Sequence, residues 1–392
     1  MVRVLLAIWA GKLAGATLRA LGRAGTHVPG IIARKVHPGI IGAIAHPPRV
    51  IAVTGTNGKT TASNLLAAAL AAQGERVASN RNGSNLAAGV TATLISAVDW
   101  RGRSRVDVGV FEMDERSAKL ILPGLRPDVL VGLNLTRDSI KRNAHPAYIA
   151  WILSSAVPST TTLVLNADDL LVADIGGDDN PRVFFAVDRM PTDGDRPSGA
   201  AVDVTICPVC DHGLTWDYWR YNHIGAAHCE ACGFRSPEAA YRAREVDAAA
   251  RRVVLDLDGE TRTAALVNEN IVNVYNQVAV AAALGVLGFD RDTVAAAFDE
   301  LAPPETRFMT DAVGSTRVVR ILTKGLVGVA CSRAFDYLRS FPGRKSIVLS
   351  IDEVSERTAD VENTAWTYDA DYDYLADDSI RQIVVGGIRR HD

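Results

Sequence analysis

The sequence predicts an α/β protein with a doubly wound, mostly parallel sheet, an inserted four-cysteine zinc ribbon and a smaller α/β domain at the C-terminal end. Three observations predict this fold class. A glycine-rich loop over residues 55–61 joins a short apolar strand to a helix. Strands and helices then alternate over residues 46–175. Two Cys-x-x-Cys pairs interrupt this alternation, and a break at Pro303 and Pro304 precedes a final segment of strands and helices.

Length and composition are those of an ordinary soluble protein. A chain of 392 residues is long enough for roughly two or three domains. The net charge of −3 gives no bulk attraction to nucleic acid or to an anionic membrane. Four of the five cysteines lie in the two pairs, which indicates metal ligation in a reducing compartment. We therefore expect a cytoplasmic protein.

We predict that residues 1–45 form an amphipathic helical segment. One face of its first helix would carry the apolar side chains of Leu5, Ile8, Trp9 and Leu13. Basic residues interrupt the apolar run well before the length of about 20 residues that a membrane span requires, so no transmembrane segment is expected. This face either packs on the protein, which we favour, or touches a membrane surface.

The glycine-rich loop predicts a phosphate-binding site. Val50 to Val53 form a buried strand, and a helix follows from Ala62 to Ala72. Backbone N–H groups of such a loop and the positive end of the helix dipole bind phosphate, while a lysine and a hydroxyl contact phosphate and Mg²⁺. The residues that take these roles are Gly55, Thr56, Asn57, Gly58, Lys59, Thr60 and Thr61.

Polar residues end the strands that follow. We predict strands over 76–78, 106–112, 129–133 and 162–165, helices over 86–98 and 146–155, and an Asn/Gly-rich loop over 80–85. Glu112 and Asn134 stand at two of these strand ends. Each residue alone would be more typical of a helix cap or turn, but parallel strands build a site at their carboxyl ends, and the recurrence on several strands favours a site. Residues 176–200 are predicted to be a surface loop.

The two cysteine pairs predict a structural zinc ion. Cys207 and Cys210 precede Cys229 and Cys232 with the spacing of a four-cysteine ribbon, in which four thiolates close the coordination shell. The aromatic residues over 216–221 either stack on bases or, as we favour, form the small core of the ribbon. Residues 201–235 hold two arginines against four acidic residues, so no nucleic-acid partner is expected.

The remaining elements are a hairpin, two helices and a final domain. Strands over 253–257 and 263–267 flank an Asp-Gly turn. Helices follow over 268–284 and 289–300, and the first of them carries Asn273 and Asn276. In the final domain we predict strands over 318–322, 347–349 and 383–385, together with helices.

Together these motifs resemble the Mur ligase superfamily. The motifs that carry the resemblance are Gly-Thr-Asn-Gly-Lys-Thr-Thr at 55–61, Glu112, Leu133-Asn134, Leu165-Asn166 and Asn273-x-x-Asn276. The zinc ribbon, the Asn80–Asn85 loop and the short final domain are similar to one branch, the MurT family of amidating synthetase subunits. The resemblance implies a central domain of Mur ligase type over 46–302, with the ribbon at about 201–236, and a MurT-type domain over 303–392.

The resemblance also implies a reaction. Such proteins use ATP, Mg²⁺ and ammonia to amidate the α-carboxylate of D-glutamate in the lipid II stem peptide, through an acyl phosphate. Lys59 would hold phosphate, Thr60 and Glu112 would bind Mg²⁺, and Asn276 would contact the nucleotide. The loop residues that would face the acceptor are Asn82, Ser84 and Asn85. The alternative is a Mur-type or folylpolyglutamate-type ligase that adds an amino acid.

A partner and a location follow from the same resemblance. A GatD-like glutamine amidotransferase would supply ammonia, and an aspartate of the final domain would orient the histidine of its Cys-His pair. Asp360 is the candidate for this third catalytic residue and Asp352 is the reserve, although both lie in an acidic stretch that is also typical of a solvated loop. With lipid II as its substrate, the protein would work near the inner face of the cell membrane.

Overall fold

The chain forms two compact units. The computed structural model describes residues 2–23, 25–80, 84–138, 145–197, 202–299, 301, 308–314, 316–321, 328–350, 364–387 and 390–391. The first unit comprises Met1–Leu135, Ala147–Pro191 and Gly233–Pro304. The second unit comprises Thr136–Pro146, Thr192–Cys232 and Glu305–Asp392.

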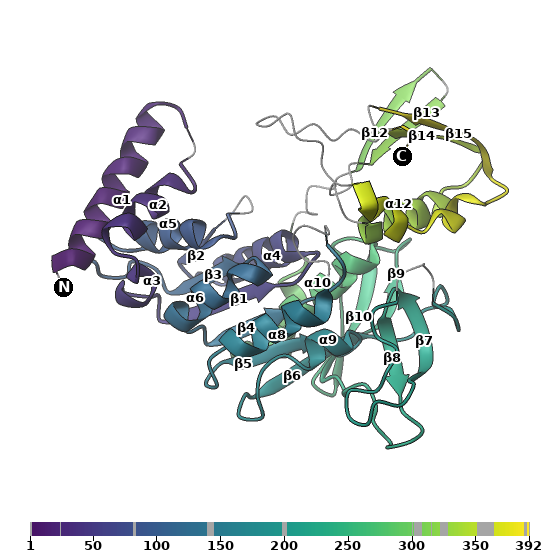
Figure 1. Ribbon diagram of the computed structural model, residues 1–392, viewed down its shortest axis with the longest axis horizontal. Coiled ribbons are helices and arrows are strands. Elements are labelled where there is room, and N and C mark those ends of the chain that lie inside the picture. The colour runs from purple at the N-terminus through teal and green to yellow at the C-terminus, as the bar shows by residue number, and fades with distance from the viewer. Residues whose placement is uncertain are drawn as a thin grey trace. The chain divides into compact units, whose positions relative to one another are not determined.

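A nine-stranded sheet is the centre of the first unit, with the strand order β11-β10-β9-β6-β5-β4-β1-β3-β2 (Figure 1). All neighbours from β9 to β2 pair in parallel, whereas β10 is antiparallel to β9 and β11. The predicted fold class, an α/β protein with a doubly wound and mostly parallel sheet, is confirmed. The strands are β1 (Arg49–Thr54), β2 (Val77–Ser79), β3 (Val108–Glu112), β4 (Val129–Gly132), β5 (Thr162–Asn166), β6 (Arg182–Val187), β9 (Tyr241–Asp247), β10 (Arg252–Leu257) and β11 (Glu260–Ala265).

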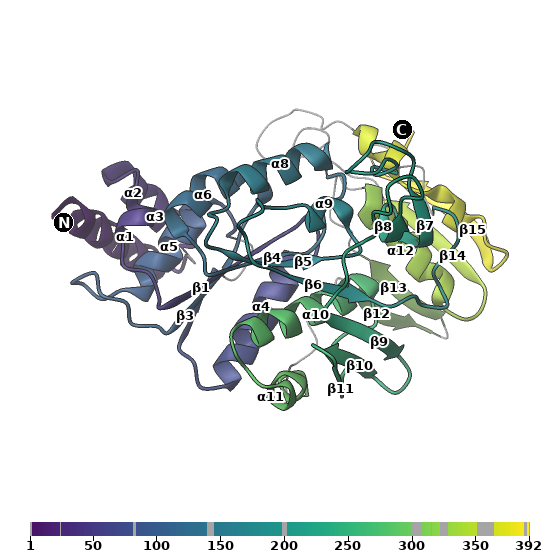
Figure 2. The same cartoon turned by 90° about the horizontal axis from the view of Figure 1, so that it is seen from below.

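Helices cover both faces of this sheet. Figure 2 shows α6 (Ala118–Leu125) and α8 (Pro146–Ala156) on one side, with α4 (Lys59–Ala72) and α10 (Ile271–Val286) on the other. Because both faces are covered, the central strands are continuous apolar runs, and every residue of β3 and β4 is buried. The other helices of the unit are α5 (Ala87–Ala97), α9 (Leu170–Ala173), α11 (Arg291–Ala296) and the short η1 (Glu115–Ser117).

Three N-terminal helices, α1 (Val2–Ala20), α2 (Val28–Val36) and α3 (Ile40–Ala43), pack within the first unit. The buried face of α1 consists of Ala7, Ile8, Gly11 and Gly15. Small residues allow these helices to approach closely: a Cβ atom on Gly30 of α2 would lie 1.8 Å from the Ala88 carbonyl oxygen of α5. The face predicted to pack on the protein is right for Ile8, which is buried, and for the partly buried Leu5. It is wrong for Trp9 and Leu13, which are exposed. None of the helices in the described part of the chain has the length and apolar character that crossing a membrane requires.

Two strands of the sheet were not predicted. The segment over 176–200, predicted to be a surface loop, contains β6, whose apolar run is flanked by Gly-, Asp- and Pro-rich stretches that dominate the local composition. β9 carries four charged residues among its seven and pairs between β6 and β10. The predicted hairpin is confirmed, and Asp258 and Gly259 have the positive φ angles, 56° and 88°, of a tight Asp-Gly turn.

The second unit contains the ribbon and the C-terminal segment. In the ribbon β7 (Thr215–Tyr221) pairs antiparallel with β8 (Ile224–His228). The strands predicted over 318–322, 347–349 and 383–385 correspond to β13 (Thr316–Ile321), β14 (Lys345–Ser350) and β15 (Ile380–Gly386). β12 (Phe308–Val313) was not predicted, and α12 (Gly328–Ser340) is a helix of the kind expected in this domain, although no range was predicted for it. The short η2 (Thr364–Asp369) and η3 (Tyr372–Leu375) complete the unit.

Arginines join the ribbon to the C-terminal segment inside this unit. Arg137 donates from Nε to Asp203 at 2.6 Å and from Nη1 to Asp369 at 3.0 Å. The Arg333 guanidinium lies 5.2 Å from the ring centre of Tyr221 in β7 and 5.1 Å from that of Tyr374 in η3. The contacts therefore group the ribbon with the C-terminal segment, while the division into domains at residues 46 and 303 stays a prediction.

Candidate active site and metal centre

The glycine-rich loop lies at the carboxyl end of β1 and leads directly into α4. Gly58 caps this helix with a φ of +88°, a left-handed conformation that glycine adopts at little cost. A Cβ atom at Gly58 would lie 2.2 Å from Oδ1 of Asn276, which projects from α10. The loop and α10 are thus in direct contact, and any other residue at position 58 would strain the backbone and displace the Asn276 amide.

Asn134, two residues beyond the end of β4, holds the loop from a second side. Its carbonyl oxygen accepts a hydrogen bond from the Thr56 N–H at 2.7 Å. Its side chain accepts from the Asn57 N–H and donates to the Asn57 carbonyl, both at 3.0 Å. The loop follows β1, which is the neighbour of β4 in the sheet. The Asn134 amide can therefore reach across and fix the loop backbone.

Lys59 is buried at the base of the loop. Its ammonium group donates to Glu115 Oε1 at 3.0 Å, to the Thr56 carbonyl at 3.2 Å and to the Gly55 carbonyl. Burial raises the pKa of Glu115, while the Lys59 charge opposes that rise. A positive charge thus lies where the loop amides would receive phosphate, and a buried carboxyl group holds it there.

Glu112 ends β3 beside the start of α4. Its carboxylate accepts from the Thr60 hydroxyl at 2.9 Å and from the Asn85 amide at 3.1 Å. Asn80 binds the Glu112 backbone on both sides, accepting from its N–H and donating to its carbonyl at 2.8 Å. Because hard oxygen ligands suit Mg²⁺, the Thr60 hydroxyl and the Glu112 carboxylate could hold this ion.

Asn276 offers one further polar atom to the loop. Its Nδ2 donates to Asn273 Oδ1 at 3.1 Å. Its Oδ1 is buried and accepts no hydrogen bond from the residues that the structure describes. An amide oxygen that is buried against Gly58 without a donor is available to a group that binds at the loop.

The structure brings most of the predicted site residues together. The loop over 55–61, Asn85, Glu112 and Asn276 meet within the first unit, and Ser84 is buried beside Asn80, which donates to its carbonyl at 2.9 Å. Asn82, Asp352 and Asp360 lie outside the described residues. Sequence reasoning gave no role to Asn80, Asn134 or Glu115. The strand-end position of Asn134 was a signal, but the pairing of Glu115 with Lys59 was not visible in the sequence.

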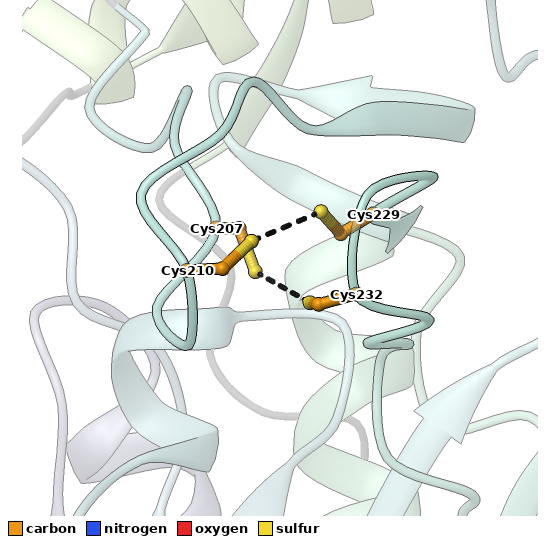
Figure 3. Close-up of side chains that lie close together, drawn as sticks. All are labelled: Cys207, Cys210, Cys229 and Cys232. Atoms are coloured by element: carbon orange, nitrogen blue, oxygen red, sulfur yellow. Dashed lines mark hydrogen bonds between the residues drawn. The ribbon is translucent and has the colours of Figure 1, made fainter.

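The four predicted metal ligands also meet (Figure 3). The sulfur atoms of Cys207, Cys210, Cys229 and Cys232 all lie within 4.8 Å of one another, and two pairs are 3.6 Å and 3.5 Å apart. A tetrahedral ion with metal–sulfur bonds of about 2.3 Å places its ligands roughly 3.8 Å apart. Hydrogen bonds from the backbone N–H groups of Cys232 and Ala231 help to lower the pKa of Cys229 to about 6. The cluster could therefore hold a metal ion.

The fold and the site define the class of the protein. Residues 53–188 match the family model of the Mur ligase middle domain, and residues 327–392 match that of the MurT ligase C-terminal domain. The chain therefore has a Mur ligase-like fold and is similar to Mur-type ligases in its middle and C-terminal segments. The solved pseudomurein peptide ligase type C from Methanothermus fervidus shares the fold with a TM-score of 0.61 at 23% identity; the match covers 79% of this chain but only 60% of that one.

Within this class, the chain is similar to one kind of protein from end to end. It is 29% identical over 388 residues to the lipid II isoglutaminyl synthase (glutamine-hydrolyzing) subunit MurT of Staphylococcus aureus strain COL, covering 98% of this chain and 85% of that protein. It is 27% identical over 397 residues to the MurT subunit of Streptococcus pneumoniae strain ATCC BAA-255 / R6, covering 100% and 86%. Both relatives are named as subunits, so each belongs to a complex.

Replacing Asn134 tests whether this side chain preorganises the loop. Asn134→Ala removes both side-chain hydrogen bonds to Asn57, so the loop must order when nucleotide binds. We expect MgATP affinity to fall about tenfold, which corresponds to ~1.4 kcal/mol. Isothermal titration calorimetry measures this change.

A second buried asparagine provides the control. Asn180 donates to the carbonyls of Pro158 and Thr161, both at 2.9 Å, and is buried away from the loop. Asn180→Ala should lower the Tm but leave MgATP affinity unchanged. Equal losses of affinity in both variants would mean that Asn134 acts only through general stability.

Proposed function

We propose that this chain is the ATP-dependent synthetase subunit that converts the α-carboxylate of D-glutamate in the lipid II stem peptide to the amide of D-isoglutamine. The observation that carries the proposal is the similarity over 98% of the chain to MurT subunits of lipid II isoglutaminyl synthase. The match of residues 327–392 to the MurT C-terminal domain supports this branch over ligases that add an amino acid.

The proposed reaction has two steps. The acceptor carboxylate attacks the γ-phosphorus of ATP, which yields an acyl phosphate and ADP. Ammonia then attacks the acyl carbon, the carbon–oxygen bond to phosphate breaks, and the nitrogen loses a proton to give the amide. Phosphoryl transfer depends mainly on positioning and charge stabilisation. In this chain the loop over 55–61 and Lys59 would hold the β- and γ-phosphates.

Other residues would complete the site around the reacting groups. Thr60 and Glu112 would bind Mg²⁺, which spreads the charge that develops on the phosphoryl group. The free Oδ1 of Asn276 would accept from the nucleotide or its water shell. The residues that would face the acceptor are Asn82, Ser84 and Asn85.

A partner would supply ammonia. We assign this role to a GatD-like glutamine amidotransferase, because the MurT relatives are subunits of a glutamine-hydrolysing enzyme. Asp360, or Asp352 in its place, would orient the histidine of the partner's Cys-His pair. Because lipid II is embedded in the membrane, the protein would work in the cytoplasm near the inner face of the cell membrane.

Zinc is the metal we assign to the four cysteines. Four thiolates satisfy a tetrahedral ion completely, which leaves no open position for substrate or water. The ion would therefore stabilise the ribbon and take no part in the chemistry.

Lys59→Ala tests the proposed reaction. The variant loses the buried ammonium beside the loop, so ammonia-dependent amidation of lipid II should fall roughly a hundredfold or more. The assay is mass spectrometry of the acceptor together with ADP release by the complex with its glutaminase. Lys119→Ala, which alters an exposed lysine of α6, should keep full activity. Transfer of an amino acid with no use of ammonia would establish the alternative ligase activity instead.

Asp360→Ala tests the assignment of the partner's third catalytic residue. Glutamine-driven amidation should fall, because the partner's histidine loses its orienting carboxylate. Amidation with added ammonium chloride should keep the wild-type rate, since the synthetase site is intact. Asp352→Ala is the matched comparison, and a loss of both activities in Asp360→Ala would contradict the role.

Cys207→Ser tests the zinc assignment. The wild-type protein should hold about one zinc ion per chain, and the variant should lose it because three thiolates leave the shell incomplete. Metal analysis by mass spectrometry measures this, and proteolysis should become faster within the ribbon. Cys331→Ser removes the cysteine outside the cluster and should keep the zinc. Full zinc content in Cys207→Ser would refute the assignment.

A further inference from the structure

The outer face of α1 carries a stripe of exposed apolar side chains. Val2, Leu6, Trp9 and Leu13 are 74%, 48%, 41% and 60% exposed. Their spacing of four, three and four residues places them on one side of the helix, opposite the buried Ala7, Ile8, Gly11 and Gly15. Packing within the first unit therefore leaves this stripe uncovered.

A neighbouring loop extends the stripe. Trp100 is 56% exposed, and its carbonyl oxygen accepts a hydrogen bond from Trp9 Nε1 at 2.8 Å. The Lys12 ammonium lies 5.7 Å from the centre of the Trp100 ring. Where α1 meets the loop over 99–105, the Trp9 indole thus contacts the Trp100 backbone and Lys12 lies over the Trp100 ring.

Positive charge surrounds these apolar residues. The sequence has no aspartate or glutamate before Glu75, although the whole chain carries a net charge of −3. The loop over 99–105 holds three exposed arginines and one carboxylate, Asp99. The basic residues of α1 and of the loop over 99–105 are Arg3, Lys12, Arg19, Arg101, Arg103 and Arg105.

We propose that this surface docks on an anionic lipid bilayer. The docking face consists of Val2, Leu6, Trp9, Leu13 and Trp100 with the six cations just named. An apolar stripe flanked by arginine and lysine is typical of helices that lie in the membrane interface, where indole rings prefer the headgroup level. Basic side chains add attraction to anionic lipid headgroups.

Charge favours a bilayer over a second copy of this chain. Two copies that met through this face would bring twelve cations together, six from each, with Asp99 as the nearby carboxylate of each loop. α1 does not meet the requirements of a membrane span, so it would lie on the bilayer with its apolar side chains inserted.

The docking face is continuous with a cavity that reaches the candidate active site. Lys12, Arg19 and Trp100 line this cavity of about 520 Å³, and so do Asn80 and Ser84. Asn80 also binds the backbone of Glu112. On the proposed function, a lipid-linked acceptor at the bilayer surface would reach the phosphate loop through this cavity. The docking itself does not depend on that function.

Vesicle binding tests the proposal with the full chain and without ATP or acceptor. Vesicles of phosphatidylcholine with about one third phosphatidylglycerol should sediment the protein, and brominated lipids should quench its tryptophan fluorescence. Vesicles of phosphatidylcholine alone should bind at least tenfold more weakly, and salt should weaken binding to the anionic vesicles.

Two variants address the two parts of the face. The double variant Leu6→Ser, Leu13→Ser and the double variant Arg101→Glu, Arg103→Glu should each lower the apparent affinity for anionic vesicles at least tenfold. Leu120→Ser alters an equally exposed leucine of α6 outside the face and should bind as the wild type does. Because all these side chains are exposed, Tm and MgATP affinity should stay unchanged.

Three results would overturn the proposal: no binding of the wild type to anionic vesicles, unchanged binding of both double variants, or a dimer in solution that Leu6→Ser, Leu13→Ser abolishes. The last result would assign the face to a second copy. Normal vesicle binding by a protein that cannot amidate lipid II would overturn the proposed function and leave the docking face standing.

Discussion

The close contact between the glycine-rich loop and its neighbours is the constraint on which the candidate site depends. Gly58 lies against Asn276 with no room for a Cβ atom, and Asn134 binds the backbone of Asn57 in both directions. A loop that is already ordered loses little conformational entropy when a phosphate binds. Strands β1 and β4 and helix α10 must all be in place for this, so the sheet itself preorganises the loop.

Burial of charge is the second determinant of the site. Lys59 and Glu115 are both buried, and such a pair is favourable only when each charge has partners. Lys59 gains the carbonyl of Thr56 in addition to the Glu115 carboxylate. The lysine is therefore held at the base of the loop, and a bound triphosphate would give its charge a new partner where phosphoryl transfer needs it.

Different contacts hold the second unit together. The cysteine cluster draws two chain segments together, and Arg333 lies between aromatic rings from the ribbon and from η3. Arg137 adds ion pairs to Asp203 and Asp369. With the proposed zinc ion bound, the four thiolates would make the ribbon rigid without a large core, so that it could support the C-terminal segment. The glycine-rich loop, by contrast, is built wholly within the first unit.

The sequence by itself determined the local features: the strand, loop and helix around Lys59, the spacing of the cysteine pairs and the turn at Asp258. Each is encoded within a few residues, by hydrophobic period, turn chemistry or ligand spacing. Only the tertiary structure decided which face of α1 is buried, that β6 and β9 join the sheet, and that Glu115 pairs with Lys59. These depend on contacts between residues far apart in the chain, and no local pattern records which distant partner a side chain will meet.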